Sequence, residues 1–322
     1  MAMWLRYRWR RRIGLVMGVL WVIYLVVPRE ETGLHHVDNF SPNPGHVHMW
    51  LYLPRKVAPH PALVVALHGC YQSAAHFAQA SGWVAQAERL GLILLLPEQQ
   101  FWNNPMRCLN WFGSKEAHGG GEVASIMAMI GQVTRTYPVD RRRVFITGLS
   151  GGGAMASLML ATSPDTFAGG GIVAGIPARC ASNAWQGALC MAFAPDRTAQ
   201  EWGDRVRQAV SPPRHWPRVS IWQGSHDWVV NPDNARELVE QWRSLHGVDT
   251  HDGQQERVDG HQRLQYRLPQ GDVVVEEHRL DQGHGQSVDP SHGCGRQGLF
   301  FPDTTSCVSE RLTQFWGLEP GA

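Results

Sequence analysis

The fold is decided by the stretch Arg143-Val-Phe-Ile-Thr-Gly-Leu-Ser-Gly-Gly-Gly-Ala-Met-Ala-Ser-Leu158. Its first part, residues 143–147, is apolar and rich in β-branched residues, which predicts a buried strand, whereas residues 153–158 predict a helix. Ser150 stands in the turn between them, within the pattern Gly-x-Ser-x-Gly. Glycines are needed at so tight a turn because a side chain there would collide with neighbouring backbone. The stretch therefore predicts a strand–turn–helix unit that presents the Ser150 hydroxyl at the end of a strand.

Uninterrupted apolar runs alternate with helical patterns along the rest of the chain. Strands of this kind are buried on both faces, which is typical of a parallel sheet covered by helices. We therefore predict an α/β fold, a three-layer α/β/α sandwich with a mainly parallel sheet. The expected strands are residues 62–67, 92–96, 143–147, 219–222 and 273–280, and the clearest helices are residues 77–90 and 122–137.

A candidate acid follows one of these strands. Functional side chains of a parallel sheet gather at the carboxyl ends of its strands. In the α/β-hydrolase fold an acid and then a histidine follow the serine along the chain. Asp227 lies in the loop after the strand at residues 219–222 and is the candidate acid. Asp233 is its rival, but its position is more typical of a residue that caps the next helix.

The sequence contains 16 histidines, so the candidate base has to be chosen by its position in the chain. His284 stands between two glycines just after the last strand-like run, in a loop that can bring its ring toward the serine. His292 is the nearest competitor, and His278 lies inside the strand. We predict a triad of Ser150, Asp227 and His284, in which His284 takes the serine proton as the hydroxyl attacks an ester carbonyl.

Two backbone N–H groups are expected to hold the negative charge that develops on the ester oxygen. One belongs to Gly151, the residue after the serine. The other should come from the loop after an early strand, here His68-Gly69-Cys70, which makes the Cys70 N–H the candidate. His68 is then a structural residue. The sequence contains no cofactor motif, and hydrolysis by this route requires neither a cofactor nor a metal.

The composition excludes several classes of protein. Of the 322 residues, 43% are hydrophobic and 18% are charged, as in an ordinary globular protein. The formal net charge is +1, and much of the basic excess lies in the first dozen residues. The body of the chain therefore lacks the cationic surplus that binding to nucleic acid requires. The 14 tryptophans suit core packing and a contact surface for a bulky substrate equally well.

The sequence of the N-terminus predicts an export signal. Five arginines between residues 6 and 12 precede the uncharged apolar run at residues 13–27. Basic-then-apolar order predicts a signal peptide or an uncleaved signal-anchor, which would tether the chain to a membrane with its body outside the cytoplasm. We expect residues 28–44 to be a linker and residues 45–322 to be the catalytic domain.

Cysteine usage agrees with export, because six cysteines without metal-binding spacing suggest disulfides in an oxidising compartment. Cys180 with Cys190 and Cys294 with Cys307 would close short loops, which leaves Cys70 with Cys108. Six cysteines allow 15 pairings, so the sequence leaves the connectivity open.

Four segments carry a family resemblance. They are Leu67-His-Gly-Cys-Tyr-Gln-Ser-Ala74, Asn104-Pro-Met-Arg-Cys-Leu-Asn-Trp-Phe112, residues 148–155, and Gly283-His-Gly285 followed by Val288-Asp-Pro290. Together they resemble the poly(3-hydroxybutyrate) depolymerase family of esterases, in the expected order and from about Pro44 to Leu318. That family is similar to feruloyl and acetylxylan esterases, which share its fold and triad.

The resemblance implies extracellular ester hydrolysis by the triad named above, and it suggests that Trp111 lies near the catalytic pocket. We expect Tyr71 and Trp222 to contact the substrate as well. Depolymerases that attack solid polyester usually carry a separate polymer-binding domain, whereas this sequence ends soon after Trp316. That difference, together with the apolar run near the N-terminus, favours hydroxyalkanoate oligomers or short acyl and aryl esters as substrates.

Two other functions are compatible with the same sequence. A serine peptidase shares the triad and its order, so only its failure to cleave amides would exclude it. A membrane-tethered binding protein that retains a hydrolase scaffold belongs to a different class, and an intact nucleophile, acid and base argue against it.

Overall fold

The computed structural model describes residues 33–248 and 253–318. The predicted signal or anchor at residues 13–27 lies outside the described residues. Within the described ranges, no helix has the length and apolar character needed to cross a membrane. The expected linker at residues 28–44 needs correction where it is described, because residues Leu34–Val37 form strand β1 and pair with the next strand.

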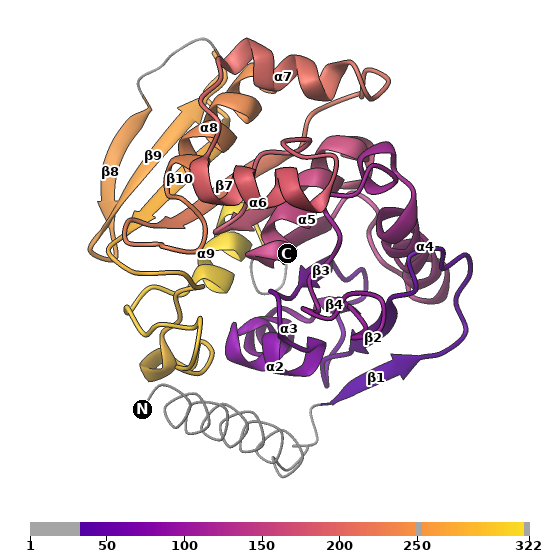
Figure 1. The fold of residues 1–322 in the computed structure, drawn as a ribbon. Coiled ribbons are helices and arrows are strands. Elements are labelled where there is room, and N and C mark those ends of the chain that lie inside the picture. The colour runs from indigo at the N-terminus through magenta and orange to yellow at the C-terminus, as the bar shows by residue number, and fades with distance from the viewer. Residues whose placement is uncertain (1–32, 249–252, 319–322) are drawn as a thin grey trace, which may run out of the picture. The chain divides into compact units, whose positions relative to one another are not determined.

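The described chain forms one ten-stranded sheet in the order β1-β2-β4-β3-β5-β6-β7-β10-β9-β8. The six central strands, from β4 to β10 in this order, run parallel, and the strands at both ends pair antiparallel. Figure 1 shows β1 and β2 at one end and β8 and β9 at the other. The strands are β1 (Leu34–Val37), β2 (His48–Tyr52), β3 (Leu63–Leu67), β4 (Ile93–Glu98), β5 (Val144–Leu149), β6 (Gly169–Val173), β7 (Arg218–Gly224), β8 (Gln254–Val258), β9 (His261–Arg267) and β10 (Val273–Leu280).

Helices cover both faces of this sheet, as the sandwich prediction requires (Figure 1). One apolar core joins the sheet to α4, α5 and α8, and a second core joins its other face to α2, α3 and α9. The helices are α2 (Ala74–Ala80), α3 (Trp83–Leu90), α4 (Gly121–Thr136), α5 (Gly151–Thr162), α6 (Ala184–Phe193), α7 (Ala199–Arg207), α8 (Asp233–His246) and α9 (Val308–Phe315), with the short 3₁₀ helices η1 (Glu116–His118), η2 (Pro164–Thr166) and η3 (Pro290–His292).

The helix expected at residues 77–90 is two helices. Helix α2 ends at Ala80, and Gly82 adopts a left-handed conformation with φ of 82° before α3 begins. A Cβ atom on Gly82 would come within 2.8 Å of the Cys294 sulfur, so this glycine also permits a close approach between distant segments. The apolar spacing is helical on both sides of the break, which is why the sequence pattern appeared continuous.

Strand β6 escaped prediction because three of its five residues are glycines, which are depleted in strands. Packing explains them. A Cβ atom on Gly170 would lie 2.3 Å from the Leu160 side chain of α5, and one on Gly171 would lie 2.5 Å from Leu312 of α9. The glycines therefore let helices on both faces pack directly onto the backbone of a central strand.

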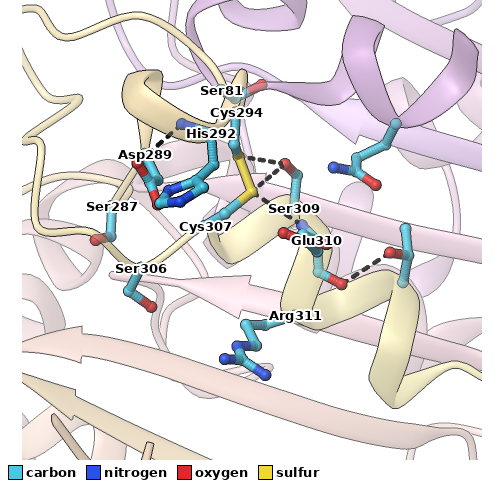
Figure 2. The surroundings of a disulfide bond; sticks show 12 residues. Ser81, Ser287, Asp289, His292, Cys294, Ser306, Cys307, Ser309, Glu310 and Arg311 are labelled. Atoms are coloured by element: carbon cyan, nitrogen blue, oxygen red, sulfur yellow. Dashed lines mark hydrogen bonds and ion pairs between the residues drawn. A yellow bond between two sulfur atoms is a disulfide. The ribbon is translucent and has the colours of Figure 1, made fainter. Parts of the chain in front are cut away.

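Three disulfides join the described cysteines: Cys70–Cys108, Cys180–Cys190 and Cys294–Cys307. These are the pairings that the short-loop argument favoured. Figure 2 shows the third, which links the segment after β10 to the start of α9. The Ser309 hydroxyl lies 3.5 Å and 3.4 Å from its two sulfurs, and the Cys307 sulfur accepts the Glu310 N–H at the helix N-terminus.

Replacing both Cys294 and Cys307 by serine should lower the free energy of unfolding by about 3 kcal/mol. The reason is that cross-linking a loop of this length restricts the unfolded chain. Serine at position 307 can still accept the Glu310 N–H, so the helix cap is retained. Urea denaturation compared with the parent protein measures the difference. A change below about 0.5 kcal/mol would show that the bond does not contribute to stability.

Candidate active site

Ser150 occupies the sharp turn that the sequence predicted between β5 and α5. Its backbone adopts φ of 58° and ψ of −119°, outside the usual regions for a residue with a side chain. The Ser150 N–H donates to the Val173 carbonyl, and its own carbonyl accepts the Ala154 N–H, both at 2.9 Å. A Cβ atom on Gly152 would lie 2.3 Å from the Leu67 carbonyl oxygen. Glycine is therefore required there for the helix to start so close to β3.

Asp227 and His284 are brought together from the loops after β7 and β10. The Nδ1 atom of His284 lies 2.7 Å from Asp227 Oδ2, and both side chains are nearly inaccessible to solvent. The Gln223 amide donates to the same carboxylate oxygen at 3.0 Å. The other oxygen accepts the N–H groups of Val229 and Val230 at 2.8 Å and 2.9 Å.

The surroundings of Asp227 favour its ionised form. Burial alone would raise its pKa, but the hydrogen bond and charge of His284, together with the two backbone donors, outweigh burial and hold the pKa below its ordinary value. A buried carboxylate in this state can fix the imidazole tautomer and stabilise the imidazolium. Because Nδ1 of His284 is engaged by Asp227, Nε2 is the ring nitrogen that is left for another partner.

The rival residues lie elsewhere. Asp233 is in the first turn of α8. His292 pairs with Asp289 at 2.6 Å and its side chain is exposed. His278 is buried within β10, with its ring stacked on Trp222 at 3.6 Å between centroids. Ser150, Asp227 and His284 instead follow β5, β7 and β10, which are parallel strands, so all three lie at the same edge of the sheet.

Two backbone donors beside Ser150 are available to a ligand. Within the described chain, neither the Cys70 N–H nor the Gly151 N–H has a hydrogen-bond partner. The two segments are in close contact, because a Cβ atom on Gly151 would lie 3.1 Å from the Cys70 sulfur. The Cys70–Cys108 disulfide therefore lies directly against the turn that carries the serine.

His68 has the structural position expected of it. Its ring is buried, its Nε2 accepts the Gln99 backbone N–H at 3.0 Å, and its Nδ1 lies 2.8 Å from the Gly69 carbonyl. These partners require a neutral ring that carries its proton on Nδ1. Burial agrees, since it lowers the pKa of His68. The residue connects the Cys70 loop to the end of β4.

The three expected substrate contacts have different positions. Trp222 is wrongly predicted: it is 1% exposed, and its Nε1 donates to the Ser220 hydroxyl inside the core. Tyr71 is 67% exposed and adjoins Cys70. Trp111 is partly buried beside Phe112, beneath Gly187 of α6. Tyr71 thus adjoins the Cys70 loop and Trp111 packs against α6, whereas Trp222 contributes to packing of the sheet.

Sequence reasoning missed a group of exposed apolar side chains around this edge. Trp185, Leu189 and Phe193 are spaced four residues apart, so they form one outward stripe along α6. The inner side of α6 packs near Ala154 of α5 and Val230 of the Asp227 loop. Further exposed side chains from loops at the carboxyl ends of the strands are Tyr71, Met106, Trp228 and Leu299. We call these seven residues the apolar rim; its helical spacing at residues 185–193 was visible in the sequence.

Comparison with known families agrees with this geometry. The family model described as "Esterase PHB depolymerase" matches residues 47–265. The chain belongs to this family. As a member of the Esterase PHB depolymerase family it is a serine-esterase-like hydrolase, and the resemblance predicted from its sequence motifs is confirmed.

Individual relatives support the assignment. The chain is 37% identical over 305 residues to poly(3-hydroxyalkanoate) depolymerase C of Paucimonas lemoignei, covering 92% of this chain and 73% of that protein. It is 32% identical over 245 residues to acetylxylan esterase A of Aspergillus oryzae, covering 70% and 74%. A solved acetyl xylan esterase from Aspergillus awamori matches with a TM-score of 0.74 at 23% identity, over 88% of this chain and 99% of that one. The α/β-hydrolase fold is thereby confirmed.

Proposed function

We propose that Ser150, Asp227 and His284 form the catalytic triad of a carboxylic-ester hydrolase. The observation that carries the proposal is the buried Asp227–His284 hydrogen bond of 2.7 Å, at the edge of the sheet where Ser150 occupies a turn with positive φ. A serine on such a turn, followed in the chain by an acid and a histidine, is the arrangement used by α/β-hydrolases.

The proposed reaction proceeds in two halves. His284 takes the Ser150 proton as the hydroxyl oxygen attacks the ester carbonyl, and the N–H groups of Cys70 and Gly151 stabilise the oxyanion. Collapse of the tetrahedral intermediate breaks the bond to the alcohol, which leaves with the proton from His284. Water then attacks the acyl-enzyme by the same route, with His284 again as base, and releases the acid.

We infer that the preferred substrates are hydroxyalkanoate esters longer than one unit. The apolar rim supports this choice, because Met106, Leu189 and Leu299 offer no polar atoms for the hydroxyl groups of a carbohydrate, yet suit the methyl and methylene groups of an aliphatic polyester. The similarity to a poly(3-hydroxyalkanoate) depolymerase also favours it. Short acyl or aryl esters of the kind named by the acetylxylan and feruloyl esterase relatives are the second candidate.

Export from the cytoplasm is part of the proposal. Three disulfides within the described residues fit an oxidising compartment. The basic and apolar segments of residues 6–27 are the features of an export signal in the sequence.

The proposed activity is tested by hydrolysis of p-nitrophenyl acetate, butyrate and octanoate, with matched amides beside them. We expect ester cleavage that Ser150→Ala abolishes, and a fall in kcat of roughly 10⁴-fold in Asp227→Asn, which retains shape but favours the wrong histidine tautomer. Full activity in folded Ser150→Ala would refute the triad. Cleavage of amides as fast as esters would favour the peptidase alternative.

The rim is tested with the double variant Trp185→Ser/Phe193→Ser. If the rim binds the chain beyond the ester being cleaved, kcat/KM for a hydroxybutyrate trimer should fall roughly 10-fold, since two buried aromatic contacts are lost. Activity on p-nitrophenyl acetate, which has no second ester unit, should not change. An equal loss on both substrates, or no loss on either, would remove the argument for oligomeric esters. Val57→Ser, which changes an exposed apolar residue before the start of β3 and outside the rim, provides the control.

A further inference from the structure

A buried carboxylate without a counterion lies behind the candidate oxyanion hole. Glu122, in the first turn of α4, is 1% exposed and forms no ion pair with any described residue. It accepts four hydrogen bonds. Its Oε2 receives the Asn110 N–H at 2.6 Å, while its Oε1 receives the side-chain amides of Asn110 at 2.6 Å, Asn103 at 3.3 Å and Gln99. All four donors come from one segment, residues 99–110.

The first connection from this carboxylate to the serine region passes through a disulfide. The Gln99 amide that donates to Glu122 also donates to the Cys108 carbonyl at 3.0 Å, and the Gln99 backbone N–H donates to the His68 ring. Cys108 is bonded to Cys70, whose sulfur lies against Gly151. Gln99 thus contacts the buried acid and His68, which precedes Cys70 by two residues. It also contacts Cys108, which is bonded to Cys70.

A second connection reaches the same loop from the other side. The Asn110 side-chain oxygen accepts the Asn104 amide at 2.8 Å, and Asn104 accepts the Met106 N–H at 2.9 Å. The Met106 carbonyl in turn accepts the Tyr71 N–H at 2.8 Å. Tyr71 has φ of 62°, so the backbone immediately after Cys70 is strained and depends on such contacts.

We propose that Glu122 is the positioning residue of the oxyanion hole, whose four accepted hydrogen bonds hold segment 99–110 and thereby aim the Cys70 N–H at the reacting carbonyl. The inference rests on the proposed function, because it assumes that Cys70 and Gly151 are the oxyanion donors. Glu122 touches neither the substrate nor the reacting atoms; it acts through Gln99, Asn110 and the Cys70–Cys108 bond.

The chemistry of the site requires an acceptor without a proton. An ionised carboxylate has no donor and can receive all four N–H bonds, whereas glutamine would turn an NH₂ group toward N–H donors that already point at it. The N-terminus of α4 also favours negative charge at this position. Protonation of Glu122 would turn one of its two oxygens into an O–H donor and so weaken the bonds that this oxygen accepts from residues 99–110.

Titration of Glu122 should therefore affect the reaction. Burial, with a smaller contribution from the nearby Glu116 carboxylate of η1, raises the Glu122 pKa to about 7. The other charged groups near the network are the Glu98–Arg107 pair beyond Gln99, while His68 is neutral. Because the folded-state pKa lies above the unfolded value, the contribution of Glu122 to stability decreases as pH rises toward 7. Ionised Glu122 therefore lowers the free energy of unfolding. Groups with pKa values shifted in this way are common at functional sites.

The first test is Glu122→Gln, assayed for ester hydrolysis from pH 5 to pH 9. We expect kcat to fall roughly 10- to 100-fold with KM nearly unchanged, because a misplaced oxyanion donor weakens transition-state binding alone. In the parent, protonation of Glu122 should add to the loss of log(kcat/KM) as the pH falls below about 7 and so steepen the slope at acid pH. In the variant this contribution to the slope should be absent. A folded variant with parental kcat and slope would overturn the proposal.

Glu116→Gln is the matched control, since it makes the same change in a neighbouring buried acid. The amide oxygen of the substituted side chain can still accept the Glu122 N–H that Glu116 accepts at 3.3 Å. We expect the plateau kcat to be unchanged and the acid limb to move to lower pH, because removal of a nearby negative charge lowers the Glu122 pKa. The Glu116→Gln profile also tests the proposal if Glu122→Gln does not fold. An acid limb at the same pH as in the parent would contradict the proposal.

Hydrogen–deuterium exchange separates this inference from the proposed activity. Glu122→Gln should speed exchange in peptides that contain residues 68–72 and 99–110 and leave β10 unchanged. If the parent cleaves no ester, the proposed function fails, but the exchange pattern still tests whether Glu122 holds the Cys70 loop. Parental exchange rates in residues 68–72 would overturn the inference whatever the activity.

Discussion

The position of Ser150 follows from the close approach of helix α5 to the central strands. Residues 151–153 carry no side chain, and the backbone of Gly152 lies where any Cβ atom would meet the Leu67 carbonyl. This contact forces the chain to reverse within one residue, and Ser150 takes the positive φ that results. Such a conformation costs roughly 1–3 kcal/mol and persists only because the buried strands and α5 over-determine it. The serine is therefore presented by packing, without support from its own side chain.

The remaining groups are placed by the order of strands in the sheet. Because β5, β7 and β10 are parallel, the loops after them open on the same edge, and Asp227 meets His284 there. The Cys70 loop reaches that edge from β3, and its covalent bond to Cys108 joins it to the segment that Glu122 holds. The loops after the parallel strands β7 and β10 thus place the candidate acid and base, whereas a disulfide and hydrogen bonds hold the loop that carries Cys70, one of the two candidate oxyanion donors.

Much of this could be predicted because the deciding signals are local. The glycine-flanked serine, the buried strands and the family motifs lie in short segments, so the fold and family were recognisable. Strand β6 was missed because its glycines are explained by Leu160 and Leu312, which are distant in the sequence. Trp222 was expected to contact the substrate, whereas its ring stacks on His278 inside the sheet. The role inferred for Glu122 depends on donors from a loop that no periodic pattern describes.

In the proposed reaction Ser150 is a nucleophile that is activated within this fold. Intact and peptide mass spectrometry after treatment with a fluorophosphonate tests it most directly, because the reagent forms a covalent adduct only with an activated serine. We expect one adduct per chain, on the peptide that contains Ser150, and its loss in His284→Ala. Protein that remains unlabelled while folded, or is labelled at another residue, would contradict it.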